Sequence, residues 1–146
     1  MTTPRHRARE IALQVLYRYD LAKAENQSVS PQDLIKELGA HYNHFEVPET
    51  LREFASELVA GTLRDVPQLD QMLEAHASNW TVARMSSVDR SLLRMAAYEM
   101  THIQDTDASV VIDEAIELAK QFGTAETPAF VNGILDAVKT ALARTR

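Results

Sequence analysis

Three arginines stand close together near the start of the chain, in the segment Arg5-His6-Arg7-x-Arg9. A guanidinium group forms two parallel hydrogen bonds to a phosphate, so arginine suits phosphate contacts better than lysine. Three such contacts bind a single strand only weakly, because the affinity scales with the number of phosphates neutralised. The segment therefore predicts a phosphate-binding element that needs help from other surfaces. A solvated helix end is the open alternative.

A second group of charged residues is acidic and lies between residues 99 and 126. Seven carboxylates occur in this stretch, with Lys120 as the single basic residue. Three of them, Asp113, Glu114 and Glu117, lie off the apolar stripe of the helix expected there. A solvated face near a helix N-terminus explains the first two. The functional alternative is docking of a basic protein, which complementary charge would speed and orient.

Motifs for catalysis or metal binding are weak in this sequence. Glu99-x-x-His102 matches one element of di-iron helical bundles, but these need a second copy and two further glutamates. His41-x-x-His44 with Glu46 lacks a convincing fourth ligand for zinc. The chain has no cysteine, no glycine-rich phosphate loop and no serine in a nucleophile motif. We therefore expect no enzyme activity, no metal and no cofactor.

The composition is that of one ordinary globular domain, with 146 residues, 45% of them hydrophobic and 25% charged. A net charge of −6 argues against nucleic-acid binding by charge alone. The first 20 residues nevertheless hold four arginines and two carboxylates, so a basic end precedes an acidic remainder. No uncharged apolar run approaches the roughly 18 residues of a membrane span, and no signal-peptide core occurs. We expect a soluble, cytoplasmic protein that does not act at a membrane.

Proline spacing and apolar periodicity indicate the elements that position these residues. Each of the five prolines precedes a stretch with helical periodicity, where its fixed φ suits the first turn. Ser30 and Ser86 are placed to cap helices, and Gly39 and Gly123 to end them. Strand signals are scarce, so the predicted fold is all-α. We expect seven helices, at residues 4–24, 31–38, 49–64, 67–77, 86–102, 109–122 and 128–143.

These helices are expected to form a single domain of two packed sub-bundles, at residues 1–79 and 80–146. The first helix is apolar around most of its circumference, so we expect it to be central. Arg7, Gln14 and Arg18 should form its exposed edge.

Two features of the second half are unusual. Gly133 falls inside a helix, where glycine costs about 1 kcal/mol relative to alanine, which suggests close helix approach or access for a ligand. Trp80 and Arg84 are spaced to stack on one another if that stretch is helical, and a structural role is favoured for them.

Four stretches of sequence occur in a fixed order between residue 5 and about residue 138. They are residues 5–10 with 12–17 (RHRARE, ALQVLY), residues 88–94 with Tyr98 and Glu99 (VDRSLLR), residues 113–123 (DEAIELAKQFG), and residues 130–136 (FVNGILD). Each is weak alone, but together they resemble the NusB family of bacterial transcription antitermination factors. The resemblance implies an all-helical fold of two packed bundles and a non-enzymatic role.

The resemblance also implies partners. Members of this family bind the single-stranded boxA element of ribosomal RNA leader transcripts together with NusE, a small-subunit ribosomal protein that also serves in transcription elongation complexes. The RNA-contacting positions carry over to Arg5, His6, Arg7, Arg9, Tyr17, Glu126 and Phe130. An acid at Asp89 would face the basic partner, with Asp113, Glu114 and Glu117 as further candidates.

Within this resemblance, Tyr17 and Phe130 are expected to stack on bases. Two positions depart from the family's pattern and reduce its positive charge. His6 stands where another arginine is common, and Ala129 stands where a lysine is common.

Two other functions compete with this one. NusB-like RNA-binding domains also precede methyltransferase domains in some enzymes, but no nucleotide-binding βαβ unit follows in this sequence. A self-associating helical module without RNA is the second alternative, and the arginine cluster argues against it. A basic partner on the acidic side would join two weak contacts into one site for the transcript. We therefore expect an adaptor.

Overall fold

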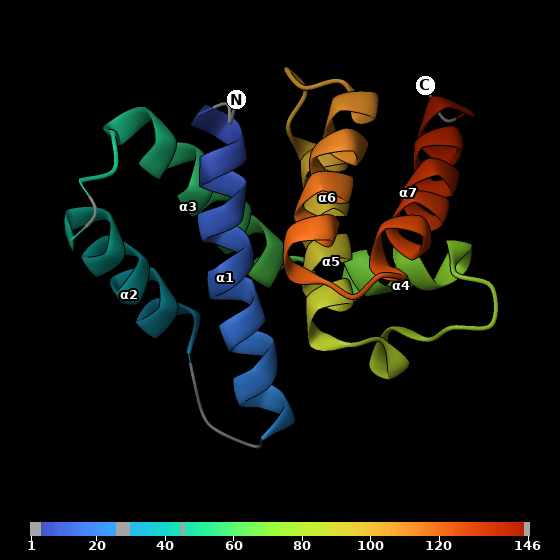
Figure 1. Ribbon diagram of the computed structural model, residues 1–146, viewed down its shortest axis with the longest axis horizontal. Coiled ribbons are helices and arrows are strands. Elements are labelled where there is room, and N and C mark those ends of the chain that lie inside the picture. Colours follow the sequence, from blue (N-terminus) through green and yellow to red (C-terminus); the bar gives the residue numbers. More distant parts are fainter. Residues whose placement is uncertain (1–3, 26–29, 45, 145–146) are drawn as a thin grey trace. The chain divides into compact units, whose positions relative to one another are not determined.

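The computed structural model describes residues 4–25, 30–44 and 46–144, and regular structure within these ranges is helical (Figure 1). The helices are α1 (Pro4–Ala24), α2 (Pro31–His44), α3 (Glu49–Arg64), α4 (Val66–His76), α5 (Ser87–His102), α6 (Ala108–Phe122) and α7 (Thr127–Arg144), with a 3-10 turn at Val82–Arg84. The all-α prediction and the seven expected helices are confirmed. Over the described ranges, no helix has the length and apolar character needed to cross a bilayer.

The largest difference from the prediction is in α2, which continues to His44 instead of ending at residue 38. Gly39 was expected to end this helix and lies inside it. Leu34, Leu38 and Tyr42 are buried at successive intervals of four residues, so the apolar stripe crosses the glycine. Burial of this stripe outweighs the local cost of glycine, and the helix continues.

The expected helix ends at Ser30, Ser86 and Gly123 are confirmed. The hydroxyl oxygen of Ser30 accepts a hydrogen bond from the amide of Asp33 at 3.1 Å. The hydroxyl oxygen of Ser86 accepts one from the amide of Asp89 at 3.2 Å. Each bond satisfies an amide that has no partner within its own helix. Helix α6 ends at Phe122, with Gly123 as its C-cap.

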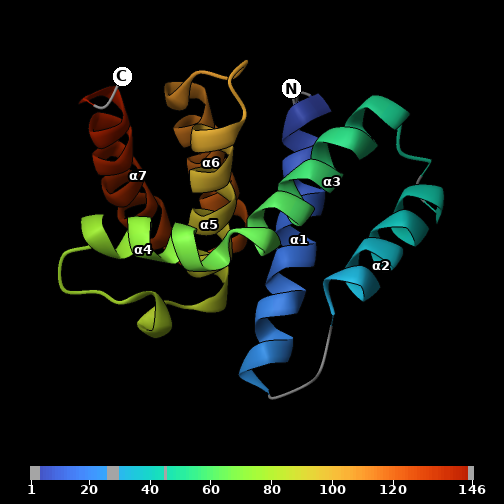
Figure 2. The same ribbon diagram turned by 180° about the vertical axis from the view of Figure 1, so that it is seen from behind.

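The chain divides into two compact units, Met1–Arg64 and Asp65–Arg146. In the first unit, α3 packs against α1 and α2. In the second, α6 packs against α5 and α7, and α4 runs across α5 and α7 (Figure 2). Helix α4 is therefore grouped with the C-terminal helices, whereas residues up to 79 were expected with the first sub-bundle.

The packing of α4 explains this grouping. Its apolar side chains Leu69 and Leu73 are almost completely buried. Asp70 accepts two hydrogen bonds from the guanidinium group of Arg94 in α5, at 2.7 and 2.8 Å. A bidentate pair of this kind fixes orientation as well as distance, and so ties α4 to α5.

Two expectations about single helix faces have different outcomes. Arg7, Gln14 and Arg18 are exposed on α1, as predicted. Gly133 is exposed on α7, and a Cβ atom placed there would meet nothing within 4 Å. Of the two explanations offered for Gly133, close approach of another helix is therefore wrong, and access for a ligand stays a prediction.

Candidate nucleic-acid interface

Two of the arginines at the start of α1 lie on one aromatic ring. The guanidinium carbon of Arg5 is 4.4 Å from the ring centre of Phe54 in α3, and that of Arg9 is 5.2 Å away. Arg9 is only 4% exposed, so its side chain offers little surface to a phosphate. Residues four apart share a helix face, and this spacing is the sequence signal that separates Arg5 and Arg9 from Arg7.

Arg7 is the most exposed of the four basic residues predicted to bind RNA, with 50% of its side chain accessible. It donates a hydrogen bond to Glu10 at 3.4 Å, and His6 Nε2 lies 3.2 Å from the other oxygen of that carboxylate. Burial, followed by the charges of Arg7 and His44, lowers the pKa of His41 in α2. Arg7 therefore has a predominantly neutral histidine near it at pH 7.

Tyr17 is also in the first unit and is 36% exposed. It follows Arg7 by ten residues, which corresponds to about 15 Å along the axis of α1. The predicted RNA-binding residues of this unit thus extend over several turns of a single helix.

In the second unit, a pocket of about 380 Å³ brings together four segments of the chain. These are the loop before α5, the first turn of α5, the loop between α6 and α7, and the first turn of α7. The residues that line it are Trp80, Arg84, Met85, Ser86, Asp89, Thr124, Glu126 and Phe130. Glu126 and Phe130, predicted to bind RNA, therefore share a pocket with Asp89, predicted to bind the protein partner.

Two aromatic rings form a corner of this pocket. The ring centres of Trp80 and Phe130 are 5.6 Å apart, and the rings meet edge to face at 71°. The guanidinium carbon of Arg84 lies over the Trp80 ring, 5.7 Å from its centre, although Trp80 precedes the 3-10 turn and is not helical as that stacking had assumed. Trp80 remains 46% exposed, and the sequence analysis did not include it among the candidate binding residues. The spacing of Trp80 and Arg84 was the available signal.

The loop that carries Trp80 is fixed by charged side chains. Arg90 in α5 donates hydrogen bonds to the carbonyl oxygens of Val82 at 2.9 Å and Met85 at 3.0 Å. A carboxylate oxygen of Glu74 accepts a bond from the amide of Val82 at 2.9 Å. Bonds to charged groups are worth about 1.5–3 kcal/mol each, so these contacts hold the loop in one conformation.

Thr127 holds the other side of the pocket. It is 1% exposed, and its hydroxyl group donates to the carboxylate of Asp89 at 2.9 Å while accepting from the amide of Thr124 at 3.0 Å. A Cβ atom at Gly123 would lie 2.5 Å from the same hydroxyl oxygen. Position 123 therefore requires glycine, because a larger side chain would clash with Thr127. Asp89 is half-buried, and one of its oxygens is engaged within the fold.

The remaining acidic residues predicted to bind a partner lie on α6, outside the pocket lining. Asp113 and Glu117 are exposed, and Glu114 is half-buried. Glu117 pairs with Lys120 at 3.4 Å on the surface, a contact that contributes little to stability. The structure therefore places the predicted partner-binding residues at two locations. Asp89 lines the pocket, and the other three residues lie on α6.

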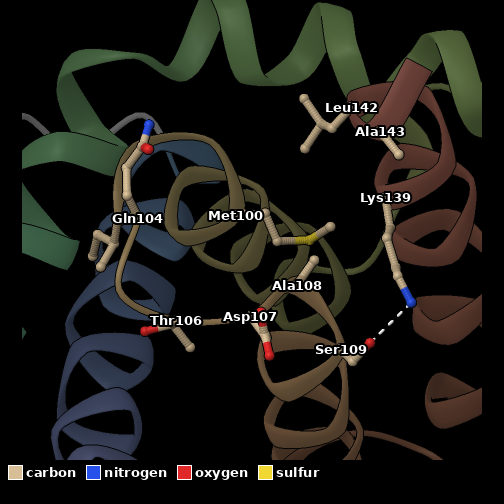
Figure 3. Close-up of a pocket in the computed structure, with 10 residues that line it drawn as sticks. Met100, Gln104, Thr106, Asp107, Ala108, Ser109, Lys139, Leu142 and Ala143 are labelled. Carbon is tan, nitrogen blue, oxygen red and sulfur yellow. Dashed lines mark hydrogen bonds between the residues drawn. The ribbon is translucent and has the colours of Figure 1, made fainter. Parts of the chain in front are cut away.

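A second pocket, of about 370 Å³, lies among the end of α5, the start of α6 and the last turns of α7 (Figure 3). The ammonium group of Lys139 donates a hydrogen bond to Ser109 at 2.9 Å there. Met100 and Leu142 contribute apolar surface. The described lining contains no aromatic ring, so this pocket offers no stacking surface for a base.

The metal motifs considered above do not assemble in the part of the chain that the structure describes. Within it, no three side chains of the ligating types form a group that could hold an ion. In Glu99-x-x-His102, the imidazole of His102 lies 3.3 Å from the carboxylate of Asp65 and stacks on the ring of Tyr98, with ring centres 4.5 Å apart. Glu99 is 1% exposed.

The fold and these sites first define a class: all-α proteins that combine arginines with aromatic rings, the pairing used to bind single-stranded nucleic acids. The model of the NusB family matches residues 6–140. The chain is 41% identical to "Transcription antitermination protein NusB" of Symbiobacterium thermophilum over 134 residues, covering 92% of this chain and 88% of that protein. The chain therefore belongs to the NusB family, and the resemblance inferred from its sequence is confirmed.

Solved structures agree with this membership. NusB from T. maritima has a TM-score of 0.80 and 32% identity, over 96% of this chain and 93% of that chain. A second structure, of antitermination factors NusB and NusE in complex with double-stranded RNA, has a TM-score of 0.81 and 27% identity, over 97% of this chain and 99% of that chain.

Proposed function

We propose that this protein is a transcription antitermination factor that binds boxA-type single-stranded RNA of ribosomal RNA transcripts together with NusE. The observation that carries the proposal is its likeness, over 97% of the chain, to a NusB solved with NusE and RNA. The protein would act in the cytoplasm, in the transcription elongation complex, as an adaptor without catalytic activity.

For the first unit, we propose Arg7 and Arg5 as phosphate contacts, because their side chains are more accessible than that of Arg9. The buried guanidinium of Arg9 supports the surface by stacking on Phe54, and it contacts a phosphate only if the helix start rearranges. His6 adds positive charge when it is protonated. Tyr17 and Phe130 are proposed to stack on bases, and Glu126 to line the same RNA surface as Phe130.

For the protein partner, we propose the acidic residues of the second unit. This unit has twelve acidic and seven basic residues, whereas the first has nine and eight. Asp89, Asp113, Glu114 and Glu117 are the candidate contacts. A basic protein such as NusE would reduce the repulsion between this unit and the phosphates of the transcript.

Single arginine variants test the RNA assignment. Arg7→Ala and Arg5→Ala should each weaken binding of a boxA oligonucleotide in the presence of NusE by roughly tenfold, since each removes a charge-assisted contact. The matched control is Arg18→Ala, which removes an exposed arginine of the same helix that pairs with Glu37 at 2.8 Å. Fluorescence anisotropy with labelled RNA measures the affinity. Wild-type affinity in both Arg5→Ala and Arg7→Ala would contradict the proposal.

A further inference from the structure

The pocket drawn in Figure 3 is lined by two side chains of opposite charge that are not paired with each other. Half-buried Lys139 on α7 donates a hydrogen bond to the neutral hydroxyl group of Ser109 at 2.9 Å, and in the described part of the chain its ammonium group forms no ion pair. Asp107 precedes α6 without capping it through its side chain, and its carboxylate forms no hydrogen bond or ion pair with the described residues. Both charges are therefore available to a ligand.

Aliphatic side chains form much of the remaining lining. Met100 is buried, and Ile103 and Leu142 are half-buried. In Figure 3, Met100 from α5 borders the same space as Leu142 and Lys139 from α7. A thioether side chain adapts its shape to an alkyl group, and an alkyl group gains free energy when it leaves water for such a surface. Because the described lining has no aromatic ring, the pocket favours an aliphatic group over a flat ring.

The charges and the aliphatic surface together select one chemical class. A simple carboxylate or a phosphate would pair with Lys139 but would be repelled by Asp107, and an alkyl amine would meet the reverse penalty. A zwitterion satisfies both side chains. The volume of about 370 Å³ is at the small end of the roughly 300–1,000 Å³ of ligand pockets, which suits a small metabolite better than a peptide. An α-amino acid with an aliphatic side chain has all of these properties.

We propose that this pocket binds a free aliphatic α-amino acid. Its carboxylate pairs with Lys139, its ammonium group pairs with Asp107, and its alkyl chain lies against Met100 and Leu142. The two charges of an α-amino acid are carried by neighbouring groups, so one molecule links side chains that do not reach each other. The site is separate from the residues proposed to bind RNA, and the inference does not depend on the proposed function.

Ligands that lack one group at a time test the assignment of the charges. Leucine is titrated into the full-length protein, and the methyl resonance of Met100, assigned through a Met100→Leu variant, is followed by NMR. 4-Methylpentanoate lacks the ammonium group of leucine, and 3-methylbutylamine lacks its carboxylate. Each should bind roughly tenfold more weakly than leucine, because a charge-assisted contact is lost. No change with leucine, or equal affinity for all three compounds, would overturn the proposal.

Glycine and inorganic phosphate test the aliphatic surface and the need for a zwitterion. Glycine keeps both charges but has no side chain, so it should bind roughly tenfold more weakly than leucine. Inorganic phosphate should not compete with leucine at comparable concentrations, because Asp107 repels it. Glycine that binds as tightly as leucine would reject the role of Met100 and Leu142. Phosphate that displaces leucine at comparable concentrations would show that the pocket is a general anion site.

Two matched pairs of variants test the charged side chains. Lys139→Gln is compared with Lys120→Gln on α6, and Asp107→Asn with Asp113→Asn on the same helix. The members of each pair remove the same charge, so their general electrostatic effects are comparable. Only Lys139→Gln and Asp107→Asn should weaken leucine binding, by about fivefold or more. Equal affinities within both pairs would contradict the assignment, and thermal unfolding checks that all four variants remain folded.

NusE and RNA distinguish this inference from the proposed function. Arg7→Ala should leave the affinity for leucine unchanged, because Arg7 is not among the residues that line the pocket. Leucine binding by a protein that binds no RNA would reject the proposed function alone. RNA binding without leucine binding would reject this inference alone. Displacement of leucine by NusE would assign the pocket to the protein partner and overturn the proposal.

Discussion

The two candidate sites use the same pair of chemical groups in opposite ways. At the start of α1, Arg5 and Arg9 lie on Phe54, a ring that is 9% exposed, and Arg9 is 4% exposed. At the pocket of the second unit, Arg84 lies over Trp80, a ring that is 46% exposed. In the first arrangement the ring is buried, whereas in the second it remains accessible to solvent. Burial of the ring, and not the residue types, separates the two arrangements.

The sharpest way to test this comparison is to remove each ring. Phe54→Ala should lower the free energy of unfolding by about 3–5 kcal/mol, because a buried aromatic side chain is lost and a cavity remains. Trp80→Ala should cost only about 1 kcal/mol, mainly through its contact with Phe130, but should weaken RNA binding by about tenfold. Urea denaturation measures stability, and anisotropy with labelled RNA measures affinity. A larger stability loss in Trp80→Ala than in Phe54→Ala would refute the comparison.

Removing Arg90 tests whether the pocket depends on a fixed loop. Arg90→Ala loses the bonds to the carbonyl oxygens of Val82 and Met85, at an expected cost of about 2 kcal/mol. The loop should then become sensitive to proteolysis. The control is Arg84→Ala, which leaves those loop bonds intact. Equal protease resistance of both variants would show that Arg90 does not hold the loop.

Two glycines in the second unit should respond to alanine with opposite signs. Gly123→Ala places a Cβ atom 2.5 Å from the hydroxyl oxygen of Thr127, and the shift that follows should cost about 1–3 kcal/mol. Gly133→Ala meets no atom within 4 Å and adds a better helix former, so it should gain about 0.5–1 kcal/mol. Thermal unfolding of both variants measures the difference. Destabilisation of the same size at both positions would contradict the structural explanation.

The accuracy of the sequence predictions follows the range of the interactions involved. The caps at Ser30 and Ser86 depend on amides three residues away, so local sequence was enough to find them. The continuation of α2 past Gly39 depends on burial of Tyr42, whose hydroxyl bonds the carbonyl oxygen of Arg52 in α3. The four-residue spacing of Leu34, Leu38 and Tyr42 was visible in the sequence, but their burial was not, and the end of α2 was therefore placed six residues early.

The prediction of the candidate site was limited in the same way, because it too depends on contacts between residues far apart in the sequence. Arg5, Arg7 and Arg9 were read as one cluster, although their helical spacing places Arg7 on a different face from the other two. That separation was available from the sequence, but the identity of the buried face was not. Phe130 follows Trp80 by fifty residues, and nothing in the sequence near either ring indicates that the two meet.

The smallest expected effect concerns pH and the neighbourhood of Arg7. Burial, and then the charges of Arg7 and His44, lower the pKa of His41 from its ordinary value of 6.5. The unfolded chain therefore takes up this proton before the folded one does as the pH falls. The contribution of His41 to stability is full above about pH 6.5 and is lost as the pH falls towards the lower pKa of the folded state. The loss should be small, because solvent screens a half-buried ring.

Two variants isolate this effect from other titrating groups. His41→Gln should reduce the difference in urea midpoint between pH 7.5 and pH 5.5, because it removes the group whose pKa changes on folding. Arg7→Ala should reduce the difference by less, since it removes the second of the three causes and leaves burial in place. Titration of the His41 ring protons by NMR gives the pKa directly. A higher pKa in Arg7→Ala would establish that Arg7 acts on His41 electrostatically, and an unchanged value would show that burial and His44 account for the shift.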